Sequence, residues 1–417
     1  MTIRGGIRVL LVAVLVFAPL ARGGVRDWAA ATIQMAMLAA AGLYALDAIR
    51  QWRWTWKRTP LDAPALVLFG LVAVSALFSE YRPATWRALG LLAVHWTFYG
   101  LASQVFDSRA RRRALVRTIF GLAFLLSLVG FVKLSGPEMV PWWVYDDIGL
   151  HAGRLSGSYG NPNHLAGFLV MTLPMMLAWG PACRSAGERF LLRVLIAVCG
   201  TALILTLSRG GWAGFSAGMA WMLAARARRR KDGGRQRVPI PTALAAVGLI
   251  LLVVLSSTPA TLRVDSLGHG REEMSFAARR AAWKGVAAMI SDAPLTGTGP
   301  GTFSRVFSRY QPPGLGARFV HAHNDPLEFA AELGLWFFPW LGWFAWRFSR
   351  ETWRNATRRS RTRRALALGG GAAFWALLVH GLVDFNLQIP ANALLAAALG
   401  ALAVGAETSE GETPERD

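Results

Sequence analysis

The sequence predicts an all-α polytopic membrane protein, and its composition, its apolar runs and the placement of its charges each indicate this class. Of the 417 residues, 54% are hydrophobic, yet the chain carries a formal net charge of +21. A soluble protein of this length does not combine these properties, whereas a polytopic membrane protein confines its charge to loops. Apolar runs of about 20 residues, the length that crosses a bilayer, recur along the chain. We therefore predict about twelve transmembrane helices and one large periplasmic loop domain.

The predicted spans follow the apolar runs in order. They cover residues 7–21, 28–49, 61–79, 86–106, 114–135, 161–180, 189–207, 210–225, 239–258, 326–346, 365–384 and 388–405. The chain is thereby divided into residues 1–258 with helices one to nine, a periplasmic loop at 259–325 with amphipathic helices, residues 326–405 with helices ten to twelve, and a tail. The polar tail, residues 406–417, is expected to be disordered and cytoplasmic.

Arginine-rich segments orient this topology. They are residues 50–58, 109–117, 184–193, 226–237 and 347–364. With the N-terminus inside, all of them fall on the cytoplasmic side, and adding or removing one span would place several outside. The topology accounts for the basic charge, and we predict no nucleic-acid binding because no reader motif accompanies it. Trp52, Trp54 and Trp56 alternate with basic residues at an inner boundary, which is typical of an interfacial anchor.

One predicted span begins at the outer face with polar side chains around its N-terminus. Asn161 is expected to cap the helix and Pro162 to be its first residue. Asn163 and His164 follow in the first turn, and Arg154 lies in the preceding loop. This helix start therefore presents several hydrogen-bonding groups to the outer side.

A second span is expected to begin in the same way. Asp325 is predicted as its N-cap and Pro326 as the first residue of a long apolar helix. His321, His323 and Asn324 lie just before this N-terminus, where unpaired N–H groups and the helix dipole favour anions. We predict that this stretch forms the edge of an active site.

Arg209 and His380 also fall at the outer edge. Arg209 lies between two apolar runs, against the charge rule, which indicates an anion clamp in preference to a snorkelling side chain at a tight Gly-Gly turn. His380 and Asp384, at helical i,i+4 spacing near the end of a predicted span, either support the site or pair with each other.

Residues 274–292 read as an amphipathic helix in the large outer loop. Its apolar face comprises Phe276, Trp283, Val286 and Ile290. Arg279 and Arg280 lie near the edge of that face, from which their side chains can reach inward.

We predict neither a cofactor nor a metal. Residues 297–301 form a glycine-rich turn without the Lys-Ser/Thr of a nucleotide-binding loop. Asp146 and Asp147 are paired carboxylates, and His321 and His323 alternate along one side of an extended segment. Neither pair has a further ligand at suitable spacing.

These polar residues are compatible with a metal-free glycan transfer. Lipid-linked substrates, unlike ATP or sugar nucleotides, are available on the outer side. Arginines bind diphosphates through bidentate contacts, and one Arg–phosphate pair is worth about 4 kcal/mol at an effective dielectric constant of 20. A neutral histidine can take the proton of an acceptor hydroxyl. The hypothesis is transfer of a glycan from a polyprenyl diphosphate to a hydroxyl.

Five motifs resemble those of the bacterial O-antigen ligase and O-antigen polymerase superfamily. They are residues 160–163, residues 207–212, Arg279 or Arg280 ahead of Trp283, residues 294–303, and residues 321–324 continuing through 332–335. The resemblance implies a GT-C-like, metal-independent, inverting glycosyltransferase of the bacterial inner membrane, with cytoplasmic termini and a periplasmic active site. Its donor would be an undecaprenyl-diphosphate-linked glycan.

The resemblance also implies roles for individual residues. Arg209 would bind the diphosphate, together with Arg279 or, one position later, Arg280. His323 would be the catalyst, with His321 as the second candidate. We expect Arg154 to join the diphosphate site, and Asn161, Asn163, His164, Asn324 and His380 to support it.

The acceptor divides the superfamily into three groups. A ligase transfers the glycan to lipid A–core, a polymerase to another lipid-linked repeat, and a third branch, the protein O-oligosaccharyltransferases, to a protein hydroxyl. The compact length and the single large insertion favour a ligase. A secondary transporter or lipid flippase remains an alternative from another class, although the polar residues gather at the outer edge and not at the bilayer midplane.

Overall fold

The computed structural model describes residues 2–136, 153–231, 276–314 and 318–405, and these parts of the chain are helical without any strand. Asp146, Asp147, the predicted span 239–258 and the tail 406–417 lie outside them. The helices are α1 (Ile3–Leu20), α2 (Asp27–Arg50), α3 (Asp62–Leu77), α4 (Arg82–Val105), α5 (Arg109–Ser135), α7 (Pro162–Trp179), α8 (Ala186–Leu205), α9 (Arg209–Lys231), α12 (Phe276–Asp292), α13 (Phe303–Val306), α14 (Asp325–Leu333), α15 (Phe337–Ala356), α16 (Arg361–Gly381) and α17 (Pro390–Val404). Short 3-10 turns lie at Arg22–Gly24, Gly180–Ala182, Phe307–Arg309 and Asn386–Gln388.

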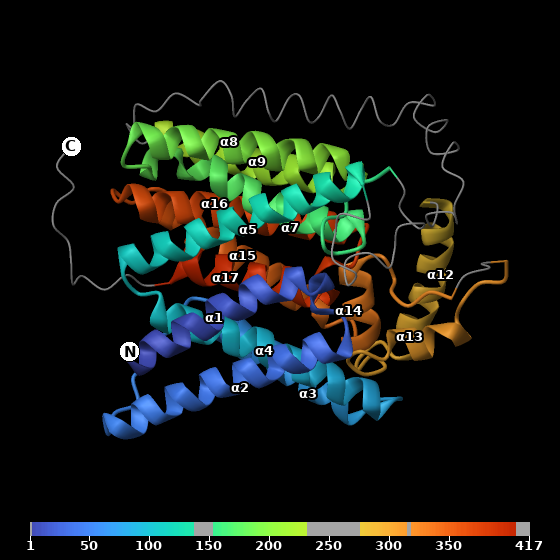
Figure 1. The fold of residues 1–417 in the computed structure, drawn as a ribbon. Coiled ribbons are helices and arrows are strands. Elements are labelled where there is room, and N and C mark those ends of the chain that lie inside the picture. The colour runs from blue at the N-terminus through green and yellow to red at the C-terminus, as the bar shows by residue number, and fades with distance from the viewer. Residues whose placement is uncertain (1, 137–152, 232–275, 315–317, 406–417) are drawn as a thin grey trace.

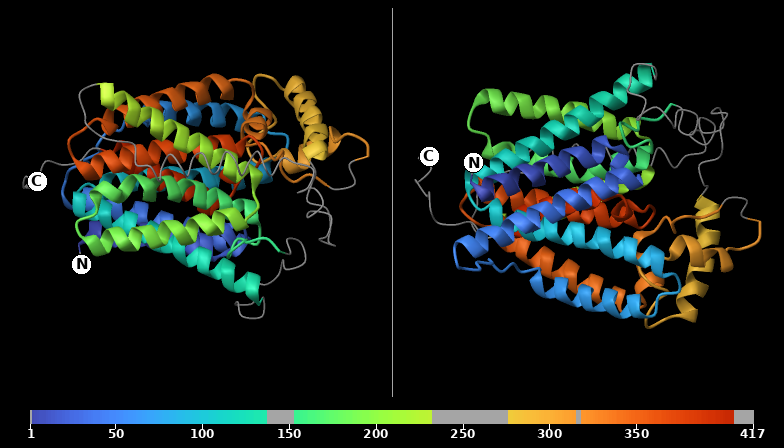
Figure 2. Two further views of the ribbon diagram at one scale, coloured as in Figure 1. Left: turned by 90° about the horizontal axis from the view of Figure 1, so that it is seen from above. Right: turned by 60° about the horizontal axis from the view of Figure 1, so that its bottom comes forward.

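The long helices lie side by side as a bundle, with α12, α13 and α14 gathered at the end opposite the N-terminus (Figures 1 and 2). Helix α9 packs closely on α16 through a row of glycines four residues apart. A Cβ atom on Gly214 or Gly218 would lie 2.4 Å from a backbone oxygen of α16. Small residues at this spacing let two helices approach closely. The contact holds the start of α9 against the end of α16.

Four helices of the described chain are long and apolar enough to cross a membrane: α1, α2, α5, and α7 with its following turn (Pro162–Ala182). Helices α3 and α17 are apolar but shorter. Ten of the twelve predicted spans each coincide with one helix of the structure. The helical class is thus observed, and four helices have the length and composition of membrane spans, whereas the count of twelve spans stays a prediction.

The predicted single span 326–346 is wrong, because the structure divides it into α14 and α15. The break is at Gly334, which adopts a positive φ of 82°. A Cβ atom there would lie 2.4 Å from the carbonyl oxygen of Leu295. The next residue, Leu335, donates its N–H to the carbonyl of Pro294 at 2.7 Å. The helix therefore ends at Gly334, and the backbone that follows it hydrogen-bonds to the turn before residue 297.

The predicted cap of this helix is also wrong by one residue. The side-chain oxygen of Asn324 accepts the N–H of Leu327 at 3.0 Å, so Asn324 is the N-cap. Asp325 is the first helical residue, and Pro326 occupies the second position. At α7 the prediction is confirmed, because Asn161 caps the helix and Pro162 begins it.

Gly334→Ala should destabilise the fold by about 1–3 kcal/mol, because alanine must adopt the left-handed backbone and its Cβ clashes with Leu295. Gly342→Ala is the matched control, since a Cβ there meets nothing within 4 Å and alanine is the better helix former. Thermal unfolding of the purified protein in detergent measures both. Equal melting temperatures for the two variants would contradict this account of the break.

Helices α12, α13 and α14 share a separate small core. Val286 and Met289 of the predicted amphipathic helix are buried against Phe303, Phe307 and Phe319. The apolar face of α12 thus packs against protein, which fixes the side on which its arginines emerge.

The predicted glycine turn is confirmed at 297–301, where Gly297, Gly299 and Gly301 all have positive φ. The N–H of Gly299 donates to the carbonyl of Glu332 at 3.1 Å. The Glu332 carboxylate accepts the N–H of Phe303 at 3.0 Å. These bonds join the turn to the C-terminal half of α14, and so position its N-terminal half.

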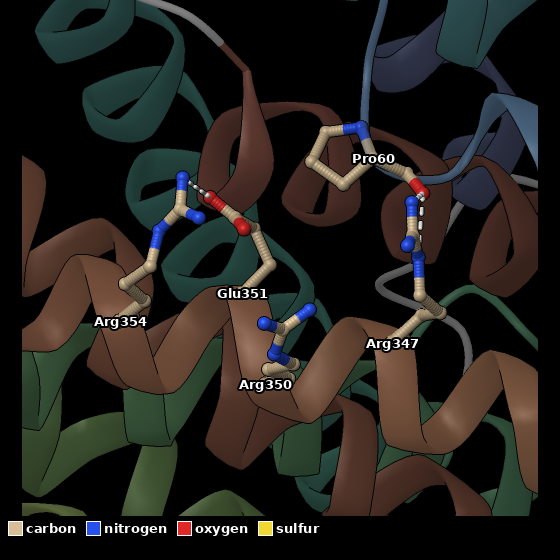
Figure 3. Close-up of a pocket in the computed structure, with 5 residues that line it drawn as sticks. All are labelled: Pro60, Arg347, Arg350, Glu351 and Arg354. Atoms are coloured by element: carbon tan, nitrogen blue, oxygen red, sulfur yellow. Dashed lines mark hydrogen bonds and ion pairs between the residues drawn. The ribbon is translucent and has the colours of Figure 1, made fainter.

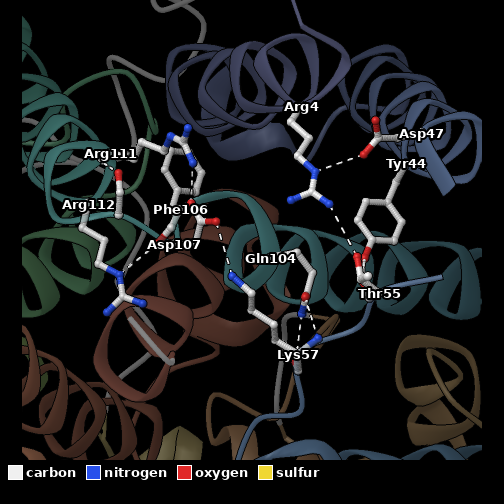
Figure 4. Close-up of polar contacts among 11 residues, drawn as sticks. Arg4, Tyr44, Asp47, Thr55, Lys57, Gln104, Phe106, Asp107, Arg111 and Arg112 are labelled. Atoms are coloured by element: carbon white, nitrogen blue, oxygen red, sulfur yellow. Dashed lines mark hydrogen bonds and ion pairs between the residues drawn. The ribbon is translucent and has the colours of Figure 1, made fainter. Parts of the chain in front are cut away.

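The N-terminal end of the bundle is held by ion pairs and hydrogen bonds between connections (Figure 4). Arg4 of α1 pairs with Asp47 of α2 at 3.0 Å. Lys57, between α2 and α3, pairs with Asp107 at 3.3 Å, and its backbone exchanges two hydrogen bonds with Gln104. Two of the predicted arginine-rich segments, 50–58 and 109–117, border these contacts, which lie at the end opposite the site described below.

Candidate active site

The loop before α14 is fixed by a buried glutamate. Glu328, 2% exposed, accepts the N–H of Ala322 at 2.7 Å and the Nδ1 of His321 at 2.8 Å. Burial alone would lower the pKa of His321, but Glu328 outweighs burial and raises that pKa above its ordinary value. The ring of His321 is therefore held in place by Glu328, and the same carboxylate favours its protonated form.

His323 differs from His321 in both backbone and environment. Its φ of 49° places it in the left-handed region, which is unusual for a residue other than glycine. Its Nδ1 is buried and has no hydrogen-bond partner within the described ranges. Burial lowers the pKa of His323 to about 4, with Arg279 and His321 contributing in the same direction and Asp384 opposing them. His323 is therefore neutral near pH 7 and retains a ring nitrogen for a ligand.

Three histidines surround the ring of Phe385. His321 stacks on it with centroids 4.2 Å apart, while His323 at 4.8 Å and His164 at 4.9 Å approach it edge-on. The phenyl ring thus holds residues from α7, the loop before α14 and the segment after α16 in one cluster. Neither the role of Phe385 nor this contact was predicted.

A carboxylate and a guanidinium lie next to this cluster. Arg279 donates through Nη1 to the carbonyl of Val383 at 2.8 Å, while its Nε is buried without a hydrogen-bond partner in the described chain. Asp384, 2% exposed, has Oδ2 3.9 Å from Nε2 of His380. The predicted pairing of His380 with Asp384 is thus present, and the field of Asp384 also reaches Arg279 and His323.

The start of α9 brings Arg209 to the same end. Ser208 Oγ lies 3.5 Å from Nε2 of His380 and accepts the N–H of Gly211 at 3.2 Å. A Cβ atom on Gly210 would lie 2.6 Å from Val383, the residue whose carbonyl binds Arg279. Arg209 is the first residue of α9 and its side chain is exposed. It therefore lies at the rim of the cluster.

Arg154, Asn161 and Asn163 join the start of α7 to the turn before α9. Arg154 donates to the carbonyl of Thr206 at 2.9 Å and to the side-chain oxygen of Asn163 at 3.0 Å. Asn161 accepts the N–H of Asn163 at 2.8 Å as the helix cap. Arg154 thus bonds to the start of α7 and to the turn before α9. These bonds fix the two helix starts relative to each other.

The structure separates the two candidate arginines of α12. Arg279 is partly buried and reaches the segment after α16, whereas Arg280 is exposed. Asn324 supports that same segment, because its side-chain amide donates to the carbonyl of Leu382 at 2.8 Å. Arg279 is thus the more buried of the two candidates.

Within the described residues, no group of three or more His, Cys, Asp and Glu side chains has the geometry to hold a metal ion. The paired Asp146 and Asp147 lie outside those residues.

Several residues of this cluster lie in a part of the chain that matches a known protein family. Residues 194–338 match the protein-family model described as O-Antigen ligase. This match covers less than half of the chain and supports the O-antigen ligase and polymerase superfamily. Members of this superfamily are glycosyltransferase-like enzymes of O-antigen pathways, which act on polyprenyl-linked glycans and acceptor glycans. A search of the curated proteins finds no match to the chain.

The superfamily match covers one part of the cluster only. It includes Arg209, Arg279, His321 and His323, but it ends before α16. His380, Asp384 and Phe385, and the α7 residue His164, come from outside the matched range. The structure therefore adds a carboxylate and an aromatic ring that the match does not contain.

Sequence reasoning missed Glu328 and Phe385 as site residues, and for Asp384 it left open support of the site or pairing with His380. Glu328 stands seven positions from His321, a separation that carries no local signal. Asp384 had a signal, since a buried carboxylate near a histidine and an arginine is typical of a functional cluster. Phe385 had none, because an aromatic residue at a helix end is ordinarily a packing residue.

Proposed function

We propose that this chain transfers a glycan from an undecaprenyl-diphosphate carrier to a hydroxyl of lipid A–core, at the periplasmic face of the bacterial inner membrane. The observation that carries the proposal is the convergence of a neutral, partly buried histidine, His323, and a partly buried arginine, Arg279, at one end of the bundle. Both have a buried nitrogen without a hydrogen-bond partner in the described chain. A buried polar atom without a hydrogen bond lowers the stability of the fold unless a ligand supplies the missing partner.

The proposed donor site is formed by Arg279 and Arg209. Arg279 offers its Nε from inside the cluster, and Arg209 lies exposed at the rim. Two guanidinium groups suit a diphosphate, and they would stabilise the negative charge that develops on it as the glycosidic bond breaks. Arg154, already bonded to Asn163, would contribute by holding the helix starts in place.

The proposed base is His323. Its neutral ring takes the proton of the acceptor hydroxyl while the hydroxyl oxygen forms a bond to the anomeric carbon of the glycan. The bond from that carbon to the diphosphate oxygen breaks, its electron pair leaves with the polyprenyl diphosphate, and a single displacement inverts the anomeric configuration. His321, held by Glu328, supplies a positive charge next to the reacting groups.

The proposed orientation places this cluster in the periplasm and both termini in the cytoplasm. It is supported by the separation of the two ends, because the arginine-rich connections around Lys57 and Asp107 lie opposite α12 and α14 (Figures 1 and 4). The positive-inside rule assigns the arginine-rich end to the cytoplasm. Twelve spans, one of them at 239–258, complete this topology.

The pH dependence of kcat/KM should reflect the low pKa of His323. A base must be neutral, so activity is lost only as the pH falls through the pKa of about 4. We expect most activity to remain at about pH 5.5, where a histidine of ordinary pKa would be about nine-tenths protonated. His321→Asn removes a positive charge and should raise the acid limit of the profile. A wild-type profile that falls near pH 6.5 would contradict the role of His323.

The test of the proposed function is glycan transfer by the purified protein in detergent with EDTA present. An undecaprenyl-diphosphate glycan is offered separately with lipid A–core and with a second lipid-linked repeat. Transfer to lipid A–core supports a ligase. Chain growth on the lipid-linked repeat would instead make the protein a polymerase, and transfer to a protein hydroxyl an O-oligosaccharyltransferase. Binding of the donor without transfer to any acceptor would favour a flippase or transporter.

A further inference from the structure

A basic pocket lies between α15 and the connection that precedes α3 (Figure 3). It has a volume of about 210 Å³ and is lined by Pro60, Arg347, Arg350, Glu351 and Arg354. None of these residues takes part in the cluster around His323. The pocket therefore needs an explanation of its own.

The lining arginines occupy one face of α15. Arg347, Arg350 and Arg354 stand at positions i, i+3 and i+7, which fall on the same side of a helix. The opposite side, including Phe348 and Thr352, is buried in the protein. Packing of α15 thus directs three guanidinium groups away from the core and towards the pocket.

Protein contacts hold the frame of the pocket. Arg347 donates through Nε and Nη2 to the carbonyl of Pro60, at 3.3 and 3.1 Å, and so joins α15 to the connection before α3. Glu351 pairs with Arg354 at 3.4 Å and accepts a hydrogen bond from the side-chain amide of Asn355 at 3.3 Å. Arg350 lies over the ring of Trp346, with its guanidinium carbon 5.6 Å from the ring centroid. Three arginines against one glutamate leave an excess of positive charge, which selects an anion.

The surroundings of the pocket place this anion at a membrane surface. Trp346 is 56% exposed, and Trp52 and Trp54, in the connection that leads to Pro60, are also exposed. Exposed tryptophans are typical of the interface between lipid and water. Lys57 of the same connection bonds to Gln104 and Asp107 at the N-terminal end of the bundle. The pocket is thus at the end opposite the candidate active site.

We propose that this pocket binds the phosphate headgroup of an anionic phospholipid from the leaflet at the N-terminal end of the bundle. Basic pockets between membrane helices recognise such headgroups through charge, and each arginine near an anionic surface contributes enough to change affinity about five-fold. A free phosphate presents the same chemistry to the arginines, but it makes no use of the tryptophans beside them. This inference depends on the membrane character of the chain and not on the glycan acceptor.

The experiment is native mass spectrometry of the full-length, delipidated protein in an uncharged detergent, titrated with phosphatidylglycerol. Separate titrations use phosphatidylcholine and inorganic phosphate. We expect tight binding of one phosphatidylglycerol. Arg350→Gln should weaken it about five-fold, and Arg350→Gln with Arg354→Gln should weaken it further. Glu351→Gln should tighten it, because that variant removes the negative charge from the pocket.

Arg358→Gln is the matched control, since Arg358 is an exposed arginine of the same basic segment that does not line the pocket. It should leave binding unchanged. Arg350 and Glu351 are chosen because their replacement keeps the contact between Arg347 and Pro60. Equal binding of phosphatidylcholine, equal loss in Arg358→Gln, or full binding by the Arg350 and Arg354 double variant would overturn the proposal. Inorganic phosphate that competes at the same concentration as the lipid would overturn the lipid source.

Discussion

Arg279→Ala should lower kcat/KM for glycan transfer by about 10²–10³-fold, the usual effect of removing one group that stabilises a developing negative charge. Arg280→Ala should have little effect. The two residues are neighbours on α12, but Arg279 is partly buried and donates to Val383 in the segment after α16, whereas Arg280 is exposed. Steady-state transfer from the lipid-linked donor, with melting temperatures as the control for folding, measures both variants.

The large effect expected for Arg279→Ala follows from the partners of its guanidinium group. Its Nη1 is fixed by a neutral carbonyl and its Nε has no hydrogen-bond partner in the described chain, so the guanidinium is held in place without being fully neutralised. The negative charge of Asp384 lies near enough to stabilise the charged form of Arg279. Arg279→Lys should recover only part of the activity, because an ammonium group lacks the bidentate geometry. A larger loss in Arg280→Ala than in Arg279→Ala would reverse the assignment.

Local sequence signals predicted the helix starts well and one helix break poorly. The start of α7 follows from Asn161 and Pro162 alone, since capping involves neighbouring residues. The break at Gly334 depends on the approach of Leu295, a residue far away in the chain. An apolar run that continues through a glycine is indistinguishable from one long helix until that tertiary contact is known. The cap of α14 is a local feature, and there the signal was ambiguous because Asn324 and Asp325 are both common N-cap residues.

The candidate site was predicted as a set of residues and not as an arrangement. Spacing and charge selected Arg209, Arg279, Arg280, His321 and His323, but doubled residues left two choices open at each of two positions. The structure distinguishes them by burial and partners, which depend on packing between α12, α14 and the end of α16. Phe385 contacts three histidines from two other segments of the chain, and no pattern within one segment encodes such a contact.

His323→Ala should lower kcat by about 10²–10⁴-fold, the range expected for loss of a general base, while binding of the lipid-linked donor is retained. His321→Ala should act differently. His321 favours the charged state and is already bonded to Glu328, so its loss should mainly weaken donor binding and raise KM. Donor affinity measured separately from single-turnover transfer distinguishes the two effects.

The contrast between the two histidines depends on the carboxylates beside them. Glu328 takes the Nδ1 proton of His321 as a hydrogen bond, which leaves that ring unable to accept a proton through Nδ1. The Nδ1 of His323 has no such partner within the described residues, and burial keeps its ring neutral. Glu328→Gln should therefore release His321 without restoring activity to His323→Ala. If the Glu328→Gln, His323→Ala double variant regained transfer, His321 would be a competent base and the preference for His323 would be wrong.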